Sequence, residues 1–322
     1  MKTFLVYNTS FFGDMILTNP LCRQLKRVYP HSHLVFISDK TYADVARYMD
    51  GVDEVWIYDK HKKHKGIIGF YNFYKEHKNA YSFDAAFIIY GNERGIFLSK
   101  LLGAKKIYAD STHKYVHRLL DNPPINYGKW YQIQDQNTYL AELYTQVPTE
   151  SLPMKYHVPE EAFAYVDSIL LKDIHKPIVA LNPITKNKEK DLKRDMLIPL
   201  IELITKESMM PVIIGTGKEL ESYYESLPEH TKEKTLNLIN KTTVPQLAAF
   251  LKRTKVLISA DTGTAHFALA LDVPVVDIFY RKNKESLRIW APKNFYRHKV
   301  LSAGDDFSAE NIWKNALELI NR

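Results

Sequence analysis

The sequence alternates short runs of β-branched and aromatic residues with longer amphipathic stretches, and this alternation constrains the fold more than any other feature. Strands that alternate with crossover helices are typical of a parallel sheet covered by helices. In the first half of the chain, the strand-like runs are 3–8, 33–38, 54–59, 84–89 and 106–109. The helix-like stretches between them are about 15–29, 41–48, 66–78 and 93–103.

A stretch with three prolines, TQVPTESLPMKYHVPEEAF, interrupts this pattern and predicts a domain junction near residues 147–158. After it, strand-like runs return at 176–183, 211–217, 235–240, 255–261 and 273–280. Helix-like stretches lie at about 193–208, 218–227, 244–253 and 264–271, and SAENIWKNALELINR closes the chain as a helix. We therefore predict two doubly wound α/β domains, 1–152 and 153–322, with a ligand-binding cleft between them. It stays open whether the last helix packs back on the first domain.

Composition excludes several classes of protein. The chain is 45% hydrophobic with a mean hydropathy of −0.30, which is typical of a soluble globular protein. Cys22 stands alone, which excludes a disulfide scaffold. Only five apolar residues precede Asn8, too few for a signal peptide, and no run is long enough to span a membrane, so we expect a cytoplasmic protein.

The formal net charge of +7 predicts either an anionic partner or a solvated basic surface. The clearest basic cluster, KHKKHK at 60–65, directly follows a strand-like run. No helix-turn-helix, RNP or zinc-finger pattern accompanies the charge, so nucleic acid is not an expected partner. Asp-x-Asp, H-E-x-x-H and G-x-S-x-G are also missing, which removes the usual markers of a metal carboxylate pair, a zincin and a serine hydrolase.

The most informative motif is ISADTGTAHFALAL, where a buried strand ends in Asp261-Thr262-Gly263-Thr264 and a helix begins at once. Free N–H groups at a helix N-terminus, a glycine and hydroxyl donors form an anion site, and His266 could bond a phosphate oxygen. An ordinary helix cap with a surface histidine is the alternative.

Two further loops follow strands of the second half. One carries Thr185 and the lysines at 186, 188 and 190, which suits a diphosphate, although such loops are often merely solvated. The other holds two glycines before Glu219 and Glu221, either of which could accept bonds from ribose hydroxyls. Leu220 replaces the third glycine of a dinucleotide fingerprint, so that class is disfavoured.

Near the start of the chain, NTSFFGDMILTNPLCRQL places Asp14 after a glycine where a strand gives way to a helix. A helix cap is the simple interpretation of this carboxylate. Together with the distant SADTGTAHFALALDVPVVDIF, however, this stretch resembles the two motifs of the glycosyltransferase family 9 heptosyltransferases, S-S-x-G-D-x-x-x-x-x-P and D-[TS]-G-x-x-H-x-A.

The resemblance implies a GT-B fold of two Rossmann-like domains facing across a cleft. The C-terminal domain would hold a nucleotide-diphospho-sugar, typically ADP-heptose, and the N-terminal domain a lipopolysaccharide inner-core acceptor, either lipid A-Kdo or an extended core. Transfer would invert the anomeric centre without a metal or other cofactor. An acceptor of this kind also implies a peripheral position on the anionic inner face of the cytoplasmic membrane.

Carried over by position, Asp14 matches the general base of the family. The donor-binding residues would be Thr185, Lys190, Glu219, Asp261, Thr262, Gly263, Thr264 and His266, with Lys188 and Glu221 as alternatives. The candidate acceptor-binding residues are Phe12, Gly13, Lys62, Lys63, Arg94 and Arg118. A transferase or epimerase for another nucleotide-sugar, and a non-catalytic nucleotide-sugar-binding protein, are the competing hypotheses.

Overall fold

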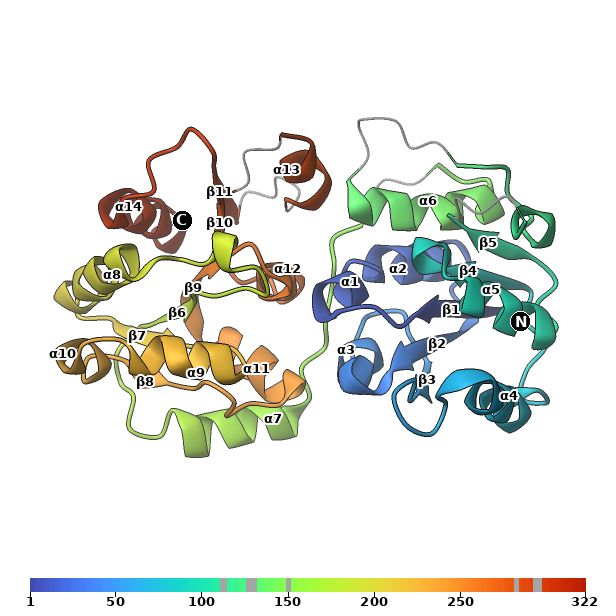
Figure 1. Cartoon of the computed structure of the whole chain (residues 1–322), viewed down its shortest axis with the longest axis horizontal. Helices are drawn as coiled ribbons and strands as arrows, with labels where there is room; N and C mark the ends of the chain where they lie inside the picture. Colours follow the sequence, from blue (N-terminus) through green and yellow to red (C-terminus); the bar gives the residue numbers. More distant parts are fainter. Residues whose placement is uncertain (111–114, 126–131, 149–151, 281–283, 292–296) are drawn as a thin grey trace. The chain divides into compact units, whose positions relative to one another are not determined.

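The computed structural model describes residues 1–110, 115–125, 132–148, 152–280, 284–291 and 297–322. The chain divides into two compact units, Met1–Tyr156 and His157–Arg322, each with its own sheet and helices (Figure 1). The point of division lies within the proline-containing junction predicted at 147–158.

The first unit is built on a parallel five-stranded sheet with the order β3-β2-β1-β4-β5. The central strand β1 lies between β2 and β4, so Leu5 faces Val35 on one side and Ala86 on the other. Every residue of β1 is buried because helices cover both faces. The strands are β1 Thr3–Asn8, β2 His33–Asp39, β3 Glu54–Tyr58, β4 Ala85–Ile88 and β5 Ile107–Ala109.

The helices of this unit follow the predicted pattern with two differences. They are α1 Phe12–Ile16, α2 Asn19–Val28, α3 Ala43–Arg47, α4 Gly66–His77, α5 Glu93–Leu101 and α6 Ile133–Thr145, with short 3₁₀ turns η1 Lys40–Tyr42, η2 Ile89–Gly91 and η3 His117–Leu119. The single helix predicted at 15–29 is wrong, because Pro20 has no N–H to continue a helix and instead opens the first turn of α2. Helix α6 was not predicted.

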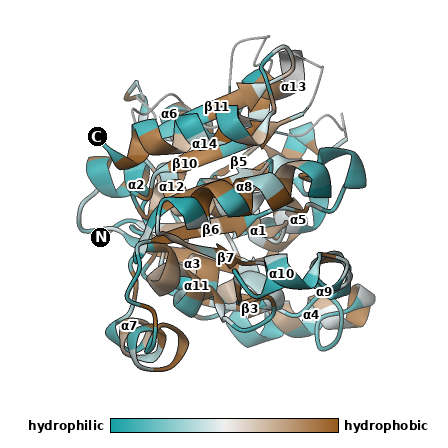
Figure 2. Ribbon diagram, turned by 90° about the vertical axis from the view of Figure 1, so that its left-hand side faces the viewer, coloured by the Kyte–Doolittle hydropathy of each residue, from teal (hydrophilic) through white to brown (hydrophobic). Residues whose placement is uncertain are grey.

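The second unit contains a parallel six-stranded sheet with the order β11-β10-β9-β6-β7-β8. Its strands are β6 Ile178–Asn182, β7 Met210–Ile213, β8 Leu236–Asn237, β9 Thr254–Ala260, β10 Val275–Phe279 and β11 His298–Ser302. Strand β11 lies at the sheet edge and was not predicted. Figure 2 shows hydrophobic colouring along strands such as β6 and β10, in keeping with their burial.

The helices of the second unit enclose its sheet. They are α7 Glu160–Tyr165, α8 Arg194–Lys206, α9 Lys218–Glu225, α10 Glu229–Lys232, α11 Val244–Leu251, α12 Gly263–Ala270, α13 Lys284–Trp290 and α14 Ala309–Ile320, with a π-helical turn η4 Val166–Leu170 and a 3₁₀ turn η5 Lys188–Lys190. The last helix, α14, packs against α8 and strands of its own unit. Its buried face includes Ile312 and Trp313, which join the core around α8.

In each parallel sheet, successive strands are added first on one side of the starting strand and then on its other side. The point where this direction changes, called the reversal below, positions the candidate groups. In the first unit the reversal lies between β1 and β4, and in the second between β6 and β9. Ligands of doubly wound folds bind at the carboxyl ends of the strands beside such a reversal. In the described part of the chain, no helix is both long and apolar enough to cross a membrane.

Candidate functional site

The loop after β1 is fixed by a buried asparagine at the end of that strand. The Asn8 side chain donates to the Asp14 carbonyl at 3.1 Å and to Thr18 Oγ1 at 2.8 Å, and the Thr18 hydroxyl donates to the same carbonyl at 2.9 Å. Asp14 occupies the third position of α1, where its Oδ2 accepts the Phe11 N–H at 3.3 Å. The carboxylate is therefore held at the carboxyl edge of the sheet by the backbone around it.

Tyr90 reaches Asp14 from the other side of the strand reversal. It follows β4, and its hydroxyl donates to Asp14 Oδ1 at 2.9 Å. Its backbone is left-handed, with φ of 56°, which costs a non-glycine residue of this size free energy. Burial, followed by the negative charge of Asp14, raises the pKa of Tyr90, so the phenol keeps its proton and stays a donor at neutral pH.

A pocket of about 450 Å³ opens beside Asp14. This volume lies within the usual range for small-molecule sites. Asp14 lines it together with Phe11, whose ring is 62% exposed. The remaining lining residues come from β1, β2, β3, α5 and their loops: Tyr7, Thr9, Ser10, Asp39, Thr41, Tyr42, Tyr58, Lys60, His61, Asn92 and Arg94.

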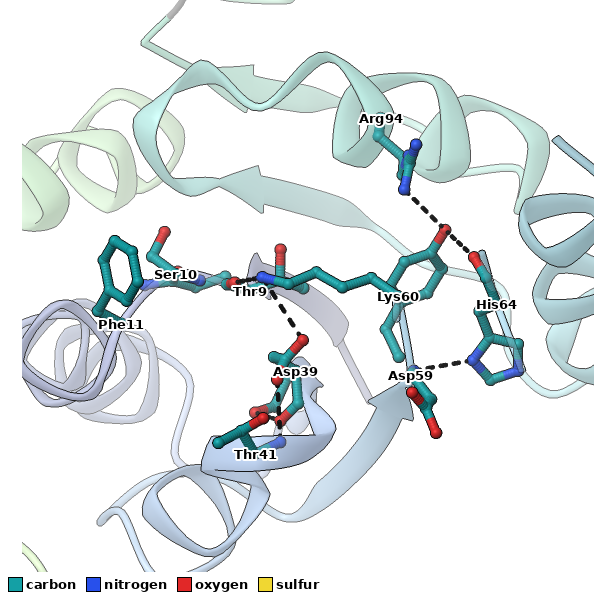
Figure 3. Close-up of polar contacts among 12 residues, drawn as sticks. Thr9, Ser10, Phe11, Asp39, Thr41, Asp59, Lys60, His64 and Arg94 are labelled. Carbon is teal, nitrogen blue, oxygen red and sulfur yellow. Dashed lines mark hydrogen bonds and ion pairs between the residues drawn. The ribbon is translucent and has the colours of Figure 1, made fainter. Parts of the chain in front are cut away.

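Basic side chains line the pocket, and hydrogen bonds or ion pairs hold them in place. Lys60 Nζ donates to the Thr9 carbonyl at 2.6 Å and lies 3.5 Å from Oδ2 of the buried Asp39 (Figure 3). Burial opposes ionisation of Asp39, but the Thr41 N–H and the Lys60 ammonium together hold its pKa below the ordinary value. Arg94 donates weakly to the Tyr58 hydroxyl at 3.4 Å. The pocket therefore offers fixed positive charge and carboxylates to one polar ligand.

Of the residues predicted to bind the acceptor, the structure places one in the pocket lining and the others outside it. Arg94 lines the pocket, whereas Phe12, Gly13, Lys62, Lys63 and Arg118 are not among its lining residues. The Phe12 ring instead lies 6.4 Å from the Tyr42 ring, and Lys63 pairs with Glu76 at 3.0 Å. Arg118 lies on η3, and Lys62 is in the exposed turn after β3.

In the second unit, the loops that carry the predicted donor residues follow three adjacent strands, β9, β6 and β7. Thr262 caps α12, and its Oγ1 accepts bonds from Thr264 N–H at 3.2 Å and from Asn182 at 3.0 Å. Asn182 ends β6, so this bond joins the two strands that flank the reversal. Gly263 is the first residue of α12, which begins directly after the turn that follows β9.

An ion pair brings the lysine loop to the glycine motif. Lys190 Nζ lies 2.8 Å from Asp261 Oδ2, and the two side chains are only 16% and 10% exposed. Because Lys190 comes after β6 and Asp261 after β9, the pair crosses the reversal, as the Tyr90–Asp14 bond does in the first unit. Lys188 forms no ion pair in the described structure.

Thr185 shapes the same loop. Its hydroxyl donates to the Asn187 carbonyl at 2.7 Å and accepts the Asn187 N–H at 2.9 Å, and its own N–H donates to Asp191 at 2.6 Å. Of the two glutamates after β7, Glu221 accepts from Asn240 at 2.7 Å, whereas Glu219 is exposed in the first turn of α9.

Two buried titratable residues lie beneath this edge. His266 is 7% exposed, so the alternative of a surface histidine is wrong. Burial lowers its pKa to about 4, although the Asp261 carboxylate opposes the shift, and the ring is neutral at pH 7. Asp277 on β10 is 2% exposed, and burial, with the negative charge of Asp261, raises its pKa well above the ordinary value. Among the described residues, no group of histidine, cysteine and acidic side chains could hold a metal ion.

Three groups were not named as site residues from the sequence: Tyr90, which contacts Asp14, and Asp39 and Lys60, which line the pocket. Each follows a strand or ends one, and the rule that ligands bind at carboxyl ends of strands could have selected Lys60 and Asp39. Tyr90 depends on a left-handed turn that no local pattern indicates.

Comparison with known proteins bears on both units. The family model for glycosyltransferase family 9 (heptosyltransferase) matches residues 77–316. The lipopolysaccharide core heptosyltransferase OpsX of Haemophilus influenzae is 21% identical over 291 residues, covering 88% of this chain and 80% of that protein.

Solved structures are similar along the whole chain. A glycosyl transferase family 9 protein from Veillonella parvula has a TM-score of 0.87 and 19% identity, covering 99% of this chain and 97% of that one. The ADP-heptose lps heptosyltransferase II of E. coli has a TM-score of 0.82 and 17% identity, covering 100% and 99%. These values indicate a shared fold in both units.

Proposed function

Since this chain belongs to glycosyltransferase family 9, the heptosyltransferase family, and has the GT-B fold of its solved relatives, we propose that it transfers heptose from ADP-heptose to a lipopolysaccharide inner-core acceptor. The name of the E. coli relative, ADP-heptose lps heptosyltransferase II, supports the choice of ADP-heptose as the donor. The first unit binds the acceptor, and the second binds the donor.

Asp14 is the general base of the transfer. An acceptor hydroxyl has a pKa far above 7, so it attacks the anomeric carbon more readily when a carboxylate takes its proton as the new bond forms. The bonds from Phe11 N–H and the Tyr90 hydroxyl orient both carboxylate oxygens of Asp14. Attack on the face opposite the departing diphosphate inverts the anomeric centre.

The acceptor lies in the pocket beside Asp14. The exposed ring of Phe11 offers a flat apolar surface for one face of a sugar. Lys60 and Arg94 bind an acidic group of the acceptor, and Asp39 accepts bonds from its hydroxyls. Phe12 and Gly13 shape the short helix that carries Asp14, and Lys62, Lys63 and Arg118 remain candidates for phosphates farther along the glycolipid.

The second unit stabilises the leaving diphosphate. When the bond from the anomeric carbon to the phosphate oxygen breaks, ADP departs with the electron pair and gains negative charge. The first N–H groups of α12, the Thr264 hydroxyl and Lys190 neutralise that charge without a metal. Asp261 positions the Lys190 ammonium, His266 donates as a neutral ring, Thr185 contributes its hydroxyl, and Glu219 accepts from the ribose.

The observation that carries this proposal is the Lys190–Asp261 pair. It joins two sequence motifs, 71 residues apart, at the strand reversal where nucleotides bind in doubly wound folds. It also supports Lys190 rather than Lys188 as the donor-binding lysine, because Lys190 contacts Asp261 of the glycine motif.

Isothermal titration calorimetry with ADP, GDP, UDP and CMP tests the donor. We expect ADP to bind and Lys190→Met to weaken it about tenfold or more, because one fixed charge on the diphosphate is lost. Lys188→Met is the matched control and should bind ADP like the wild type. Preference for UDP would assign another nucleotide-sugar, and no binding of any nucleotide would contradict a transferase.

A further inference from the structure

Two isoleucines are almost fully exposed at the start of α4. Ile67 is 87% exposed and Ile68 is 78% exposed, and Tyr71, one turn later, is 51% exposed. Isolated apolar residues are common on surfaces, but two adjacent branched side chains that project this far need a reason. The opposite face of α4 packs inward through Gly69 and Phe73.

The apolar tip is surrounded by positive charge. Residues 60–78 contain six lysines and a single acidic residue, Glu76. Glu76 pairs with Lys63, while Lys62 and Lys65 form no ion pair in the described structure. Lys75 lies against the exposed Tyr71 ring, with Nζ 5.1 Å from its centroid. The exposed apolar side chains therefore lie next in sequence to lysines of which Lys62 and Lys65 have no acidic partner in the described structure.

This surface is held rigidly by the turn that precedes it. Asp59 N–H donates to His64 Nδ1 at 2.9 Å, the Tyr58 hydroxyl donates to the His64 carbonyl at 3.2 Å, and His64 N–H donates to the Asp59 carbonyl at 2.8 Å (Figure 3). A Cβ on Gly69 would lie 2.2 Å from the carbonyl carbon of His64, so the turn and the helix are in direct contact. Ile67 and Ile68 are thus presented by a fixed structure.

We propose that this surface, formed by Ile67, Ile68, Tyr71, Lys62 and Lys65, docks on an anionic phospholipid bilayer. The isoleucines enter the boundary between headgroups and acyl chains, and the lysines contact the headgroup phosphates. A protein partner would have to supply an apolar pocket ringed by acidic groups, whereas a bilayer offers both features everywhere on its surface. Two isoleucines and a tyrosine also form a smaller apolar area than a stable protein interface needs.

The position of the surface adds a second argument, which rests on the proposed function. Lys60 and His61, from the same turn, line the pocket beside Asp14. Docking through α4 would therefore hold the pocket close to the headgroups, where a glycolipid presents its sugars. Figure 1 shows α4 on the outside of its unit, near the edge strand β3.

The test uses the full-length protein and co-sedimentation with vesicles of phosphatidylcholine alone or mixed with phosphatidylglycerol. We expect binding to the mixed vesicles only, weaker at high salt, and reduced about tenfold by the double variant Ile67→Asn/Ile68→Asn. Ile169→Asn is the matched control, because Ile169 is 62% exposed on the second unit. It should bind as the wild type does, and thermal melts would verify that all variants fold.

Equal binding by the double variant, or no wild-type binding to anionic vesicles, would overturn this assignment. Transfer to a deacylated, soluble acceptor separates this question from the proposed function. The double variant should keep the wild-type rate there and lose rate only with acceptor embedded in vesicles. A wild type that binds vesicles but transfers no heptose would contradict the proposed function and leave the docking surface intact.

Discussion

At the scale of single residues, Asp14 accepts a hydrogen bond on each of its carboxylate oxygens. It is not the first cap of a long helix but the third residue of the short helix α1, and its Oδ2 accepts the Phe11 N–H there. Its Oδ1 meanwhile accepts from Tyr90, a residue in a left-handed conformation. Strain of this kind persists only where surrounding structure enforces it, and it is common at functional sites.

Tyr90→Phe should therefore slow transfer while leaving ADP affinity unchanged. Loss of a donor to the carboxylate disfavours its ionised form, so the acidic limb of the pH profile of kcat/KM should move to higher pH. Tyr42→Phe is the control, because Tyr42 lines the same pocket and has no hydrogen bond to Asp14 in the described structure. An unmoved limb in Tyr90→Phe would show that the tyrosine does not act through Asp14.

His266 predicts a pH dependence of stability. The pKa of His266 in the folded protein, about 4, lies below the ordinary value of 6.5. Between pH 4 and pH 6.5 the histidine is therefore protonated in the unfolded chain and neutral in the folded chain. The free energy of unfolding should fall from pH 7 to pH 5 by roughly 2 kcal/mol more than in His266→Gln. Urea titrations at both pH values measure this, and parallel losses in the two proteins would contradict a buried neutral ring.

At the scale of elements, the strands were predictable because buried parallel strands form short continuous apolar runs between turn residues. The exceptions have physical reasons. Strand β11, HKVLS, has only two buried residues and lies at an edge, so its pattern is weak. Helix α6 has a polar composition and is buried partly through Gln134, Asn137 and Thr138.

The candidate donor site was largely predictable for the same reason, because its residues follow strands within recognisable motifs. The contacts around Asp14 were not, since Tyr90 reaches it across 76 residues through a turn whose φ no local rule indicates. The sequence also did not show which lysine lines the pocket. It favoured Lys62 and Lys63 for the acceptor, whereas Lys60 lines the pocket.

Gly69 gives a prediction at this scale. Replacing a helix glycine with alanine normally stabilises a protein by up to about 1 kcal/mol. In α4 the added methyl group would overlap the His64 backbone, so Gly69→Ala should instead lower the free energy of unfolding by about 2 kcal/mol or more. Asn72→Ala, at an exposed position of α4, is the control. A Gly69→Ala protein as stable as the wild type would show that the turn does not pack on the helix.

At the scale of the whole molecule, each unit has a polar side-chain contact at the same place in its sheet. A polar contact crosses the reversal of strand order, Tyr90 to Asp14 in the first sheet and Lys190 to Asp261 in the second. One contact orients a carboxylate and the other a cation, which are the groups that a glycosyl transfer needs for its acceptor and its leaving group.

The most direct test measures heptose transfer from ADP-heptose to an inner-core acceptor by the wild type and by Asp14→Asn, which keeps the shape of the side chain. We predict a loss of about 100-fold or more in kcat, with unchanged ADP affinity and an unchanged melting temperature. Asp44→Asn, on an exposed carboxylate of the same unit, should keep the wild-type rate. Near-normal transfer by Asp14→Asn would contradict the assignment of Asp14 as the base.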